Sequence, residues 1–299
     1  MADVEFDAHS PSGRDRLTSL CAVCAALVAI ALSASACSMF DQFNPFGNEK
    51  YKMEVTPDVP ASKTYDQALQ KLANGAPAEA AKKFTDLGKQ YPDSDWARKG
   101  LLMSTYADYQ AGDYTSAETS AERYLKDYPN SPEADYVLYL QANAYYMQIP
   151  DISRDQEKTA KAMETFKSVV DKYPKSEYAE DAKFKITVTE DQLAGKEMSI
   201  GRFYLNRRNY TAAINRFRNV LQYYQTTRHA PEALYRLVEA YLGLGITSEA
   251  QTAAAVLGHN FPDSQWYHDA YDLLKGKGLS PQEFGGSWIS KIWRTVVPS

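Results

Sequence analysis

The chain has 299 residues with 38 acidic and 33 basic side chains, and its net charge of −5 by itself indicates no class of partner. All three cysteines lie within the first 37 residues, so the remainder has none for a disulfide or a thiol nucleophile. The four histidines lack metal-ligand spacing, and the sequence contains neither a G-x-S-x-G elbow nor a phosphate-binding loop. We therefore predict no enzyme activity, no metal and no cofactor.

Residues 1–36 have the pattern of a secretory signal. Arg14 and Arg16 precede an apolar run over residues 20–34. This run is shorter than the ~20 residues that a membrane-spanning helix needs. We therefore expect export of the chain, which also makes nucleic acid an unsuitable partner.

The end of this signal, Ala34-Ser35-Ala36-Cys37, resembles the lipobox of bacterial lipoproteins, although Ala34 stands where that pattern usually has Leu, Val or Ile. The resemblance implies cleavage before Cys37, lipidation of this cysteine and attachment to a membrane. Ser38, in place of Asp, favours the outer membrane. The alternative is an ordinary cleaved signal with a small-residue site.

Residues 37–60 are mostly polar and include three prolines. Such a composition buries little apolar surface, so we predict a flexible tether between the lipid and a folded body. About 240 residues remain, enough for one large domain, two ordinary domains or a repeat array.

A short aromatic-proline-x-serine mark punctuates this remainder. Proline cannot continue a helix, and a serine two positions later can cap the next one with its side-chain oxygen. A degenerate fifth mark begins at Tyr224. The four full copies are Tyr91-Pro92-Asp93-Ser94, Tyr128-Pro129-Asn130-Ser131, Tyr173-Pro174-Lys175-Ser176 and Phe261-Pro262-Asp263-Ser264.

Between marks, apolar residues recur at helical spacing on both sides of a short polar turn. In the clearest unit Gly112-Asp113 separates two helices, and Ala117 and Ala121 stand where the helices must approach closely. This arrangement resembles the tetratricopeptide repeat, whose period is ~34 residues. The resemblance implies an all-α fold, a right-handed α-solenoid of five helix pairs over residues 61–275.

The distances between marks test this prediction. The steps from Tyr91 to Tyr128 and from Tyr224 to Phe261 are both 37 residues. The step from Tyr128 to Tyr173 is 45 residues, which predicts an extra loop around residues 149–153. The step from Tyr173 to Tyr224 is 51 residues, and the excess of 14 is close to four turns at ~3.6 residues each. We therefore predict one long helix over residues 177–207.

A helix-pair array offers an extended concave surface, and the 22 tyrosines of the chain are suited both to such a surface and to the core between helices. Residues 200–240 carry an excess of arginine, a residue that recognises carboxylates in a bidentate manner. This stretch is either a solvated basic face or a binding surface for an acidic protein.

Residues 276–299 form a tail in which Trp288, Ile289, Ile292 and Trp293 recur at helical spacing. An amphipathic segment of this kind can lie on a membrane surface or bind a partner. We favour a third role, in which the tail covers the apolar face of the last repeat.

The folded region also resembles the BamD family of outer-membrane assembly lipoproteins, its alphaproteobacterial members most. The order of lipobox, tether and five repeats matches as well. The residues that carry the resemblance are Asp135–Tyr139 and Lys196–Tyr210, with the continuation Ala212–Phe217.

The resemblance implies a scaffold on the periplasmic face of the outer membrane that helps to insert β-barrel proteins. Its implied partners are BamA, the other BAM subunits and unfolded outer-membrane proteins. Arg216 stands at the family's BamA-contacting arginine, and Arg207, Arg208 and Arg218 lie near it in the sequence. By position, the candidates for substrate binding in the N-terminal repeats are Tyr65, Tyr106, Tyr109 and Tyr139.

Two alternatives stay open. A soluble periplasmic repeat protein that coordinates envelope division or peptidoglycan synthesis would share the repeats but would not need Cys37. An enzyme or enzyme subunit would need a catalytic constellation that the sequence does not contain.

Overall fold

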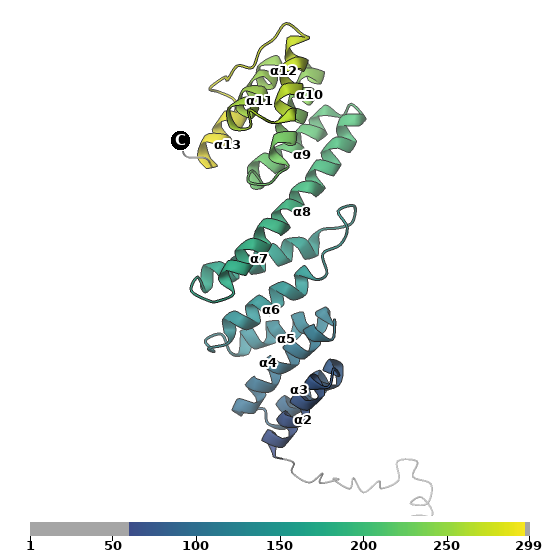
Figure 1. The fold of residues 1–299 in the computed structure, drawn as a ribbon, viewed down its shortest axis with the longest axis vertical. Helices are drawn as coiled ribbons and strands as arrows, with labels where there is room; N and C mark the ends of the chain where they lie inside the picture. Colours follow the sequence, from purple (N-terminus) through teal and green to yellow (C-terminus); the bar gives the residue numbers. More distant parts are fainter. Residues whose placement is uncertain (1–59, 297–299) are drawn as a thin grey trace, which may run out of the picture. The chain divides into compact units, whose positions relative to one another are not determined.

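The computed structural model describes residues 60–296, with side chains as far as residue 293. The signal of residues 1–36, the lipidation site Cys37 and the tether 37–60, apart from its last residue, lie outside the described residues. The regular structure of the described part consists of α-helices only (Figure 1). The helices are α2 (Ala61–Ala73), α3 (Pro77–Gln90), α4 (Asp95–Gln110), α5 (Tyr114–Asp127), α6 (Ala134–Tyr146), α7 (Glu157–Lys172), α8 (Ala179–Asn206), α9 (Tyr210–Tyr223), α10 (Ala230–Leu244), α11 (Thr247–Asn260), α12 (Gln265–Lys275) and α13 (Trp288–Val296).

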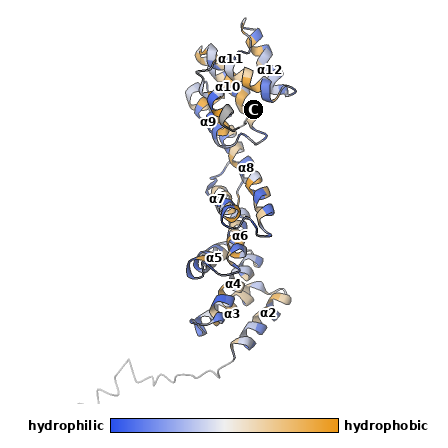
Figure 2. Cartoon of the chain, turned by 90° about the vertical axis from the view of Figure 1, so that its left-hand side faces the viewer, coloured by the Kyte–Doolittle hydropathy of each residue, from blue (hydrophilic) through white to orange (hydrophobic). Residues whose placement is uncertain are grey.

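The helices from α2 to α11 form five pairs, and each helix packs against the next one along the chain. The predicted all-α fold of tetratricopeptide type is therefore confirmed. The fifth pair ends at Asn260, and α12 is an additional single helix that packs on α10 and α11. The helices labelled in Figure 2 carry both hydrophilic and hydrophobic residues. A helix that is buried on one side only needs such a mixture.

Four of the turns within pairs share one hydrogen-bonding pattern. In each, an amide N–H reaches back five residues to a helix carbonyl, for example from Asp113 to Asp108 at 3.0 Å. This pattern closes the helix through a residue in the left-handed region, a position that favours glycine. Three of these turns have glycine there, at Gly75, Gly112 and Gly245, with φ between +74° and +77°. The fourth has Arg208, with φ of +59°.

The aromatic-proline marks end helices as predicted. The aromatic residue of each full mark, such as Tyr91, is a C-cap, and its N–H bonds to the carbonyl four residues back. The predicted serine cap is correct at Ser264, whose Oγ accepts a hydrogen bond from the N–H of Trp266 at 3.3 Å. It is wrong at Ser94, whose hydroxyl instead donates to the carbonyl of Tyr91 at 2.7 Å.

Both predictions from the irregular spacings are confirmed. The extra residues of the third unit form the segment between Tyr146 and Glu157, the end of α6 and the start of α7. The long helix is α8, with 28 residues. Its two halves belong to different core clusters, because Ala182 packs with α6 and α7, whereas Ala194 and Met198 pack with α9 and α10.

Gly195 and Gly201 do not interrupt α8, because both are sites of close approach. A Cβ at position 195 would lie 2.6 Å from the side chain of Ile152, which belongs to the segment before α7. A Cβ at position 201 would lie 2.4 Å from the ring of Phe217 in α9. The glycines therefore let the long helix contact its neighbours on two sides.

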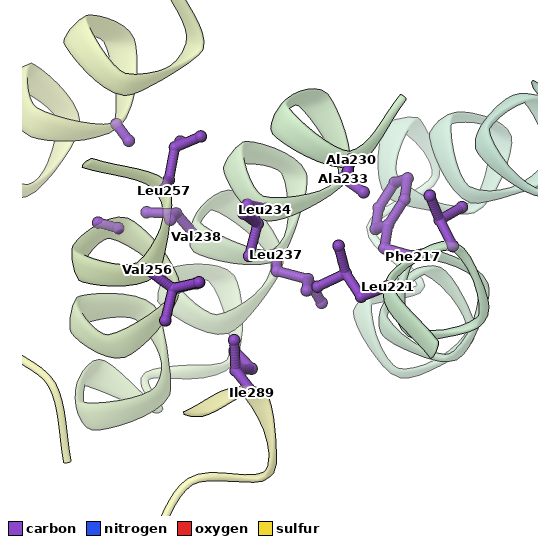
Figure 3. Close-up of a cluster of buried hydrophobic side chains, with 14 of the residues drawn as sticks. Phe217, Leu221, Ala230, Ala233, Leu234, Leu237, Val238, Val256, Leu257 and Ile289 are labelled. Carbon is purple, nitrogen blue, oxygen red and sulfur yellow. The ribbon is translucent and has the colours of Figure 1, made fainter. Parts of the chain in front are cut away.

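The largest core cluster joins α8–α13 (Figure 3). Phe217 and Leu221 of α9 face Leu234 and Leu237 of α10 in this cluster. Ile289 of the tail, 1% exposed, enters the same cluster.

The tail lies on the second helices of the last two pairs. Helix α13 packs on α11 and α9, and Trp293 is buried with Ile289. The indole Nε1 of Trp288 donates to the hydroxyl of Tyr241 at 2.7 Å, and the hydroxyl of Ser287 donates to Glu249 at 2.6 Å. This packing agrees with a cap on the last repeat, extended to α9. Within residues 60–296 no helix is both long and apolar enough to span a membrane.

The contact between Gly201 and Phe217 yields a first prediction. Replacing Gly201 by Ala places a methyl group 2.4 Å from the edge of the Phe217 ring, and we expect this overpacking to lower the stability by about 1–3 kcal/mol. The change is read from the thermal midpoint by circular dichroism. Gly285→Ala is the matched control, because a Cβ there meets nothing within 4 Å. A midpoint for Gly201→Ala at or above that of the unaltered protein would contradict the prediction.

Candidate functional site

A cluster of tyrosines lies on the first helices of the second, third and fourth pairs. The ring of Tyr139 stacks on that of Tyr178 with centroids 4.8 Å apart and planes at 19°. The ring of Tyr136 lies 5.3 Å from the same Tyr178. We call this group the tyrosine cluster; its members are Tyr106 and Tyr109 of α4, Tyr136 and Tyr139 of α6, and Tyr178 just before α8.

Burial raises the pKa of three phenols of the cluster, those of Tyr109, Tyr136 and Tyr178. Burial raises the pKa of Tyr136 to about 12, and the neighbouring phenols of Tyr106 and Tyr178 contribute to the rise. Burial and a hydrogen bond with Glu177 raise the pKa of Tyr178 to about 12. Phenols of this kind keep their protons, so the surface presents aromatic faces together with hydroxyl donors and acceptors.

Lys185 of α8 supplies a positive charge to this surface. Its Nζ lies 5.0 Å from the ring centroid of Tyr139 and 5.6 Å from that of Phe166, within the range of cation–π attraction. The same Nζ donates to the hydroxyl of Tyr139 at 3.1 Å and to the amide oxygen of Asn143. It also forms an ion pair with Asp181 at 2.9 Å. One lysine therefore connects α8 to α6 and α7.

The protonation of this group follows from its contacts. Burial opposes the charge of Lys185, but hydrogen bonds with Asp181 and Tyr139 outweigh it and raise the pKa of the lysine. Burial also opposes the ionisation of Asp181, and hydrogen bonds from Tyr139 and Lys185 outweigh it and lower the pKa of the carboxyl. Lysine and aspartate are therefore both charged at neutral pH.

The structure brings together three of the four tyrosines that the sequence singled out, namely Tyr106, Tyr109 and Tyr139. Tyr65 lies apart from them in α2, where its ring packs 5.4 Å from Phe84 and 5.6 Å from Trp96. Sequence reasoning missed two members of the cluster, Tyr136 and Tyr178, and the neighbouring Lys185.

The arginine proposed as the main partner contact has an intramolecular partner. Nη1 of Arg216 lies 3.2 Å from Oε1 of Glu197 in α8, and Nδ2 of Asn219 donates to the same carboxylate at 2.9 Å. The side chain of Arg216 remains 38% exposed. Since a guanidinium has five N–H donors, this pair leaves donors for a second carboxylate.

The other three predicted arginines face different surroundings. The guanidinium of Arg218 lies 4.9 Å from the ring of Trp288 in the tail, and that of Arg207 lies 4.0 Å from the ring of Phe203. Arg208 lines a cavity formed by α8, α10 and α12. On α9, Arg216 and Arg218 are about 200° apart around the helix axis. The four arginines therefore do not form one patch.

Further arginines of this stretch are neutralised within the fold. Arg202 of α8 holds both oxygens of Glu232 in α10, at 2.9 and 3.0 Å. Arg236 contacts Glu232 at 3.3 Å and Glu239 at 2.7 Å. Much of the apparent basic excess is therefore an ion-pair network between α8 and α10.

Among the described residues, no group of three or more His, Cys, Asp or Glu side chains is placed to hold a metal ion. The surfaces of α4, α6 and α8 and of α8–α12 instead offer rings, hydroxyls and guanidinium groups. Groups of this kind recognise other polypeptides.

The fold and these surfaces define a helical-repeat scaffold of the tetratricopeptide class, a kind of protein that presents extended surfaces to other proteins. Residues 57–257 match the family model YfiO, described as an outer membrane lipoprotein. The chain belongs to this family.

Curated relatives of the chain carry the name outer membrane protein assembly factor BamD. The relative from Caulobacter vibrioides is 44% identical over 260 residues, which are 87% of this chain and 83% of the relative. The relative from Rickettsia prowazekii is 40% identical and covers 73% of this chain and 86% of its own length. The one from Neisseria meningitidis serogroup A is 31% identical, with 73% and 85% covered.

The similar solved structures include tetratricopeptide proteins. The TPR2AB domain of yeast Sti1 has a TM-score of 0.36 and 12% identity, and the match covers 73% of this chain and 85% of that one. A thermophilic TPR protein of Thermus thermophilus has a TM-score of 0.32 and 15% identity, with 71% and 98% covered. At these low scores the fold assignment depends on the helix pairing described above.

The contacts of Lys185 yield a second prediction. Lys185→Met keeps the apolar stem but removes the ion pair and two hydrogen bonds, so we expect a loss of about 1–3 kcal/mol at pH 7. Urea unfolding measures this loss. Lys183→Met is the control, because its pair with Glu180 is exposed and worth at most about 0.5 kcal/mol.

The stability that the ion pair of Lys185 and Asp181 contributes should depend on pH, and the lowered pKa of Asp181 determines the direction. The pKa of Asp181 is lowered in the folded state, so its stabilising effect is present above its ordinary pKa of 3.8 and is lost as the pH falls through the folded value. The stability difference between the unaltered protein and Lys185→Met should therefore shrink at acid pH. A difference that stays constant down to full protonation of Asp181 would show that the ion pair contributes nothing.

Proposed function

We propose that this chain is a lipoprotein scaffold of the β-barrel assembly machinery, on the periplasmic face of the outer membrane. A lipid on Cys37 anchors it, its C-terminal repeats hold BamA, and it takes part in a complex with other BAM subunits. Its N-terminal repeats receive unfolded outer-membrane proteins. The observation that carries the proposal is the 44% identity to the Caulobacter vibrioides outer membrane protein assembly factor BamD over 87% of the chain.

The tyrosine cluster is suited to an unfolded barrel protein. A strand of such a protein alternates apolar with polar side chains and is rich in aromatic residues at its ends. The stacked pair of Tyr139 and Tyr178 offers an aromatic face to the apolar positions, and the phenol hydroxyls of the cluster offer hydrogen-bond partners to backbone groups. Tyr65, which lies outside the cluster, is a separate candidate in the first repeat.

The arginines are suited to a folded acidic partner. Arg216 is already aligned by Glu197 and Asn219, so little side-chain freedom is lost when a second carboxylate binds. Arg207 and Arg208 are exposed in the turn after α8, where they are accessible to a partner separately from Arg216. Arg218 contacts the tail, so a partner that binds Arg218 also meets Trp288.

The experiment that tests the proposal is a mild-detergent pull-down of the tagged full-length protein, with mass spectrometry of the proteins that accompany it. We expect a BamA-like β-barrel protein to dominate. Peptidoglycan or division proteins without any barrel protein would replace the proposal with a periplasmic scaffold of another pathway.

Arg216 yields a third prediction. Arg216→Glu should weaken the complex with BamA by about tenfold or more, since a buried interfacial charge pair is worth ~2–5 kcal/mol. The substitution also places two carboxylates together, because Glu197 lies beside it. Binding is therefore measured by interferometry, together with helical content by circular dichroism.

The exchange Arg216→Glu with Glu197→Arg separates the two effects. It restores the pair between α8 and α9 but reverses the charge at position 216. If Arg216 contacts BamA, the exchange restores stability and leaves binding weak. Recovery of both stability and binding would show that Arg216 acts only within the fold.

Cys37 yields a fourth prediction. Cys37→Ser removes the thiol that carries the lipid, so we expect the protein to move from the membrane fraction to the soluble fraction. Fractionation after a high-salt wash, which removes protein held only by charged partners, measures this shift. Retention of the variant in washed membranes, at the level of the unaltered protein, would contradict the lipid anchor.

A further inference from the structure

Arg208 occupies a position that the fold otherwise gives to glycine. The turn after α8 has the same hydrogen bonds as the turns at Gly75, Gly112 and Gly245, with the N–H of Asn209 bonded to the carbonyl of Tyr204 at 3.0 Å. Arg208, the residue in the left-handed region of this turn, has φ of +59°. This conformation is energetically unfavourable for residues other than glycine. Glycine would make this turn more easily, so the turn itself does not account for the arginine.

The side chain of Arg208 lines a cavity of about 420 Å³ between α8, α10 and α12, three helices that follow one another in space (Figure 1). One wall is the ring of Tyr210, which lies against the backbone of α10 because position 243 is glycine. A Cβ there would lie 2.5 Å from this ring. Leu242 and Leu273 add apolar wall to the cavity. Its volume lies in the lower part of the range of about 300–1,000 Å³ that is typical of ligand pockets.

The charges of the cavity are unequal. Arg208, Arg236 and Lys277 line it together with one carboxylate, Glu239. Nη1 of Arg236 lies 2.7 Å from Glu239, so these two charges offset each other. Within the described part of the chain neither Arg208 nor Lys277 has a salt bridge, and both residues are exposed. Two cations therefore flank an apolar wall without an acidic partner.

We propose that this cavity binds a carboxylate carried next to an apolar side chain, on an acidic segment of a partner protein. Arg208 and Lys277 hold the carboxylate, and Tyr210 and Leu273 hold the apolar neighbour. A guanidinium binds a carboxylate through two parallel hydrogen bonds, which is a reason to have arginine at the turn in spite of its backbone cost. This inference rests on the proposed function, because it describes how the C-terminal repeats of the scaffold would recognise a partner.

The test uses a defined probe. It is a fluorescein-labelled decapeptide with two Leu-Glu pairs in a Gly-Ser background, and a second peptide has Gln in place of both Glu residues. Fluorescence polarisation with the full chain at low ionic strength measures binding. We expect the Glu peptide to bind and the Gln peptide to bind about tenfold more weakly.

Arg208→Gly is the decisive variant, because it suits the backbone of the turn and removes only the side chain. We expect it to weaken binding of the Glu peptide by about tenfold, with a thermal midpoint no lower than that of the unaltered protein. Lys277→Gln should weaken binding as well. Lys275→Gln, an exposed lysine of α12 outside the cavity, is the matched control and should bind as the unaltered protein does.

Three results would overturn the inference. They are equal binding of the Glu and Gln peptides, absence of binding by the unaltered protein, and unchanged affinity of Arg208→Gly. None of them bears on the pull-down, which depends on the whole complex. Failure of the cavity and failure of the proposed function are therefore distinguishable.

Discussion

The continuity of α8 is the constraint on which the rest of the structure depends. This helix contributes Ala182 to the core around α6 and α7, and Ala194 and Met198 to the core around α9 and α10. Ala194 and Met198 follow Ala182 by 12 and 16 residues, so they lie about 120° and 160° from it around the helix axis, and α8 turns different faces toward the two cores. Gly195 and Gly201 then let Ile152 and Phe217 contact the helix from two sides. The two groups of repeats have separate cores, and α8, which joins them, is itself packed against side chains of neighbouring elements.

Elements that depend on local chemistry were predictable from the sequence. Proline after an aromatic residue marks the ends of α3, α5, α7 and α11, and the spacing of these marks predicts both the long α8 and the segment before Glu157. The serine caps were less predictable. A hydroxyl can either accept from the next helix, as Ser264 does, or donate to the previous one, as Ser94 does. The sequence shows that a hydroxyl is present but not which of these two hydrogen bonds it forms.

The candidate site was predictable in part, because its side chains come from distant positions. The sequence places three of the tyrosines, Tyr106, Tyr109 and Tyr139, on the first helices of their pairs. Lys185 lies near them because the rotation of α8 about its own axis turns this side chain toward Tyr139. The arginine stretch misled for a similar reason. Glu197, the carboxylate that pairs with Arg216, precedes residues 200–240, the stretch that is rich in arginine. Within that stretch Glu232 pairs with Arg202, and Glu239 pairs with Arg236. A charge count along the chain cannot show which ions neutralise each other across helices.

The segment between α6 and α7 is held to α8 mostly through its own backbone. Gln192 donates to the carbonyl of Pro150 at 3.2 Å, and Lys196 donates to the carbonyls of Ser153 and Arg154, both at 2.9 Å. Because every residue type has a backbone carbonyl, most residues of this segment can be replaced among relatives without loss of its hydrogen bonds to α8. We expect the evolutionary constraint to fall instead on α8, on Gln192 and Lys196, whose side chains donate, and on Gly195, which faces Ile152. Substitutions should therefore accumulate on one side of this contact and be rare on the other.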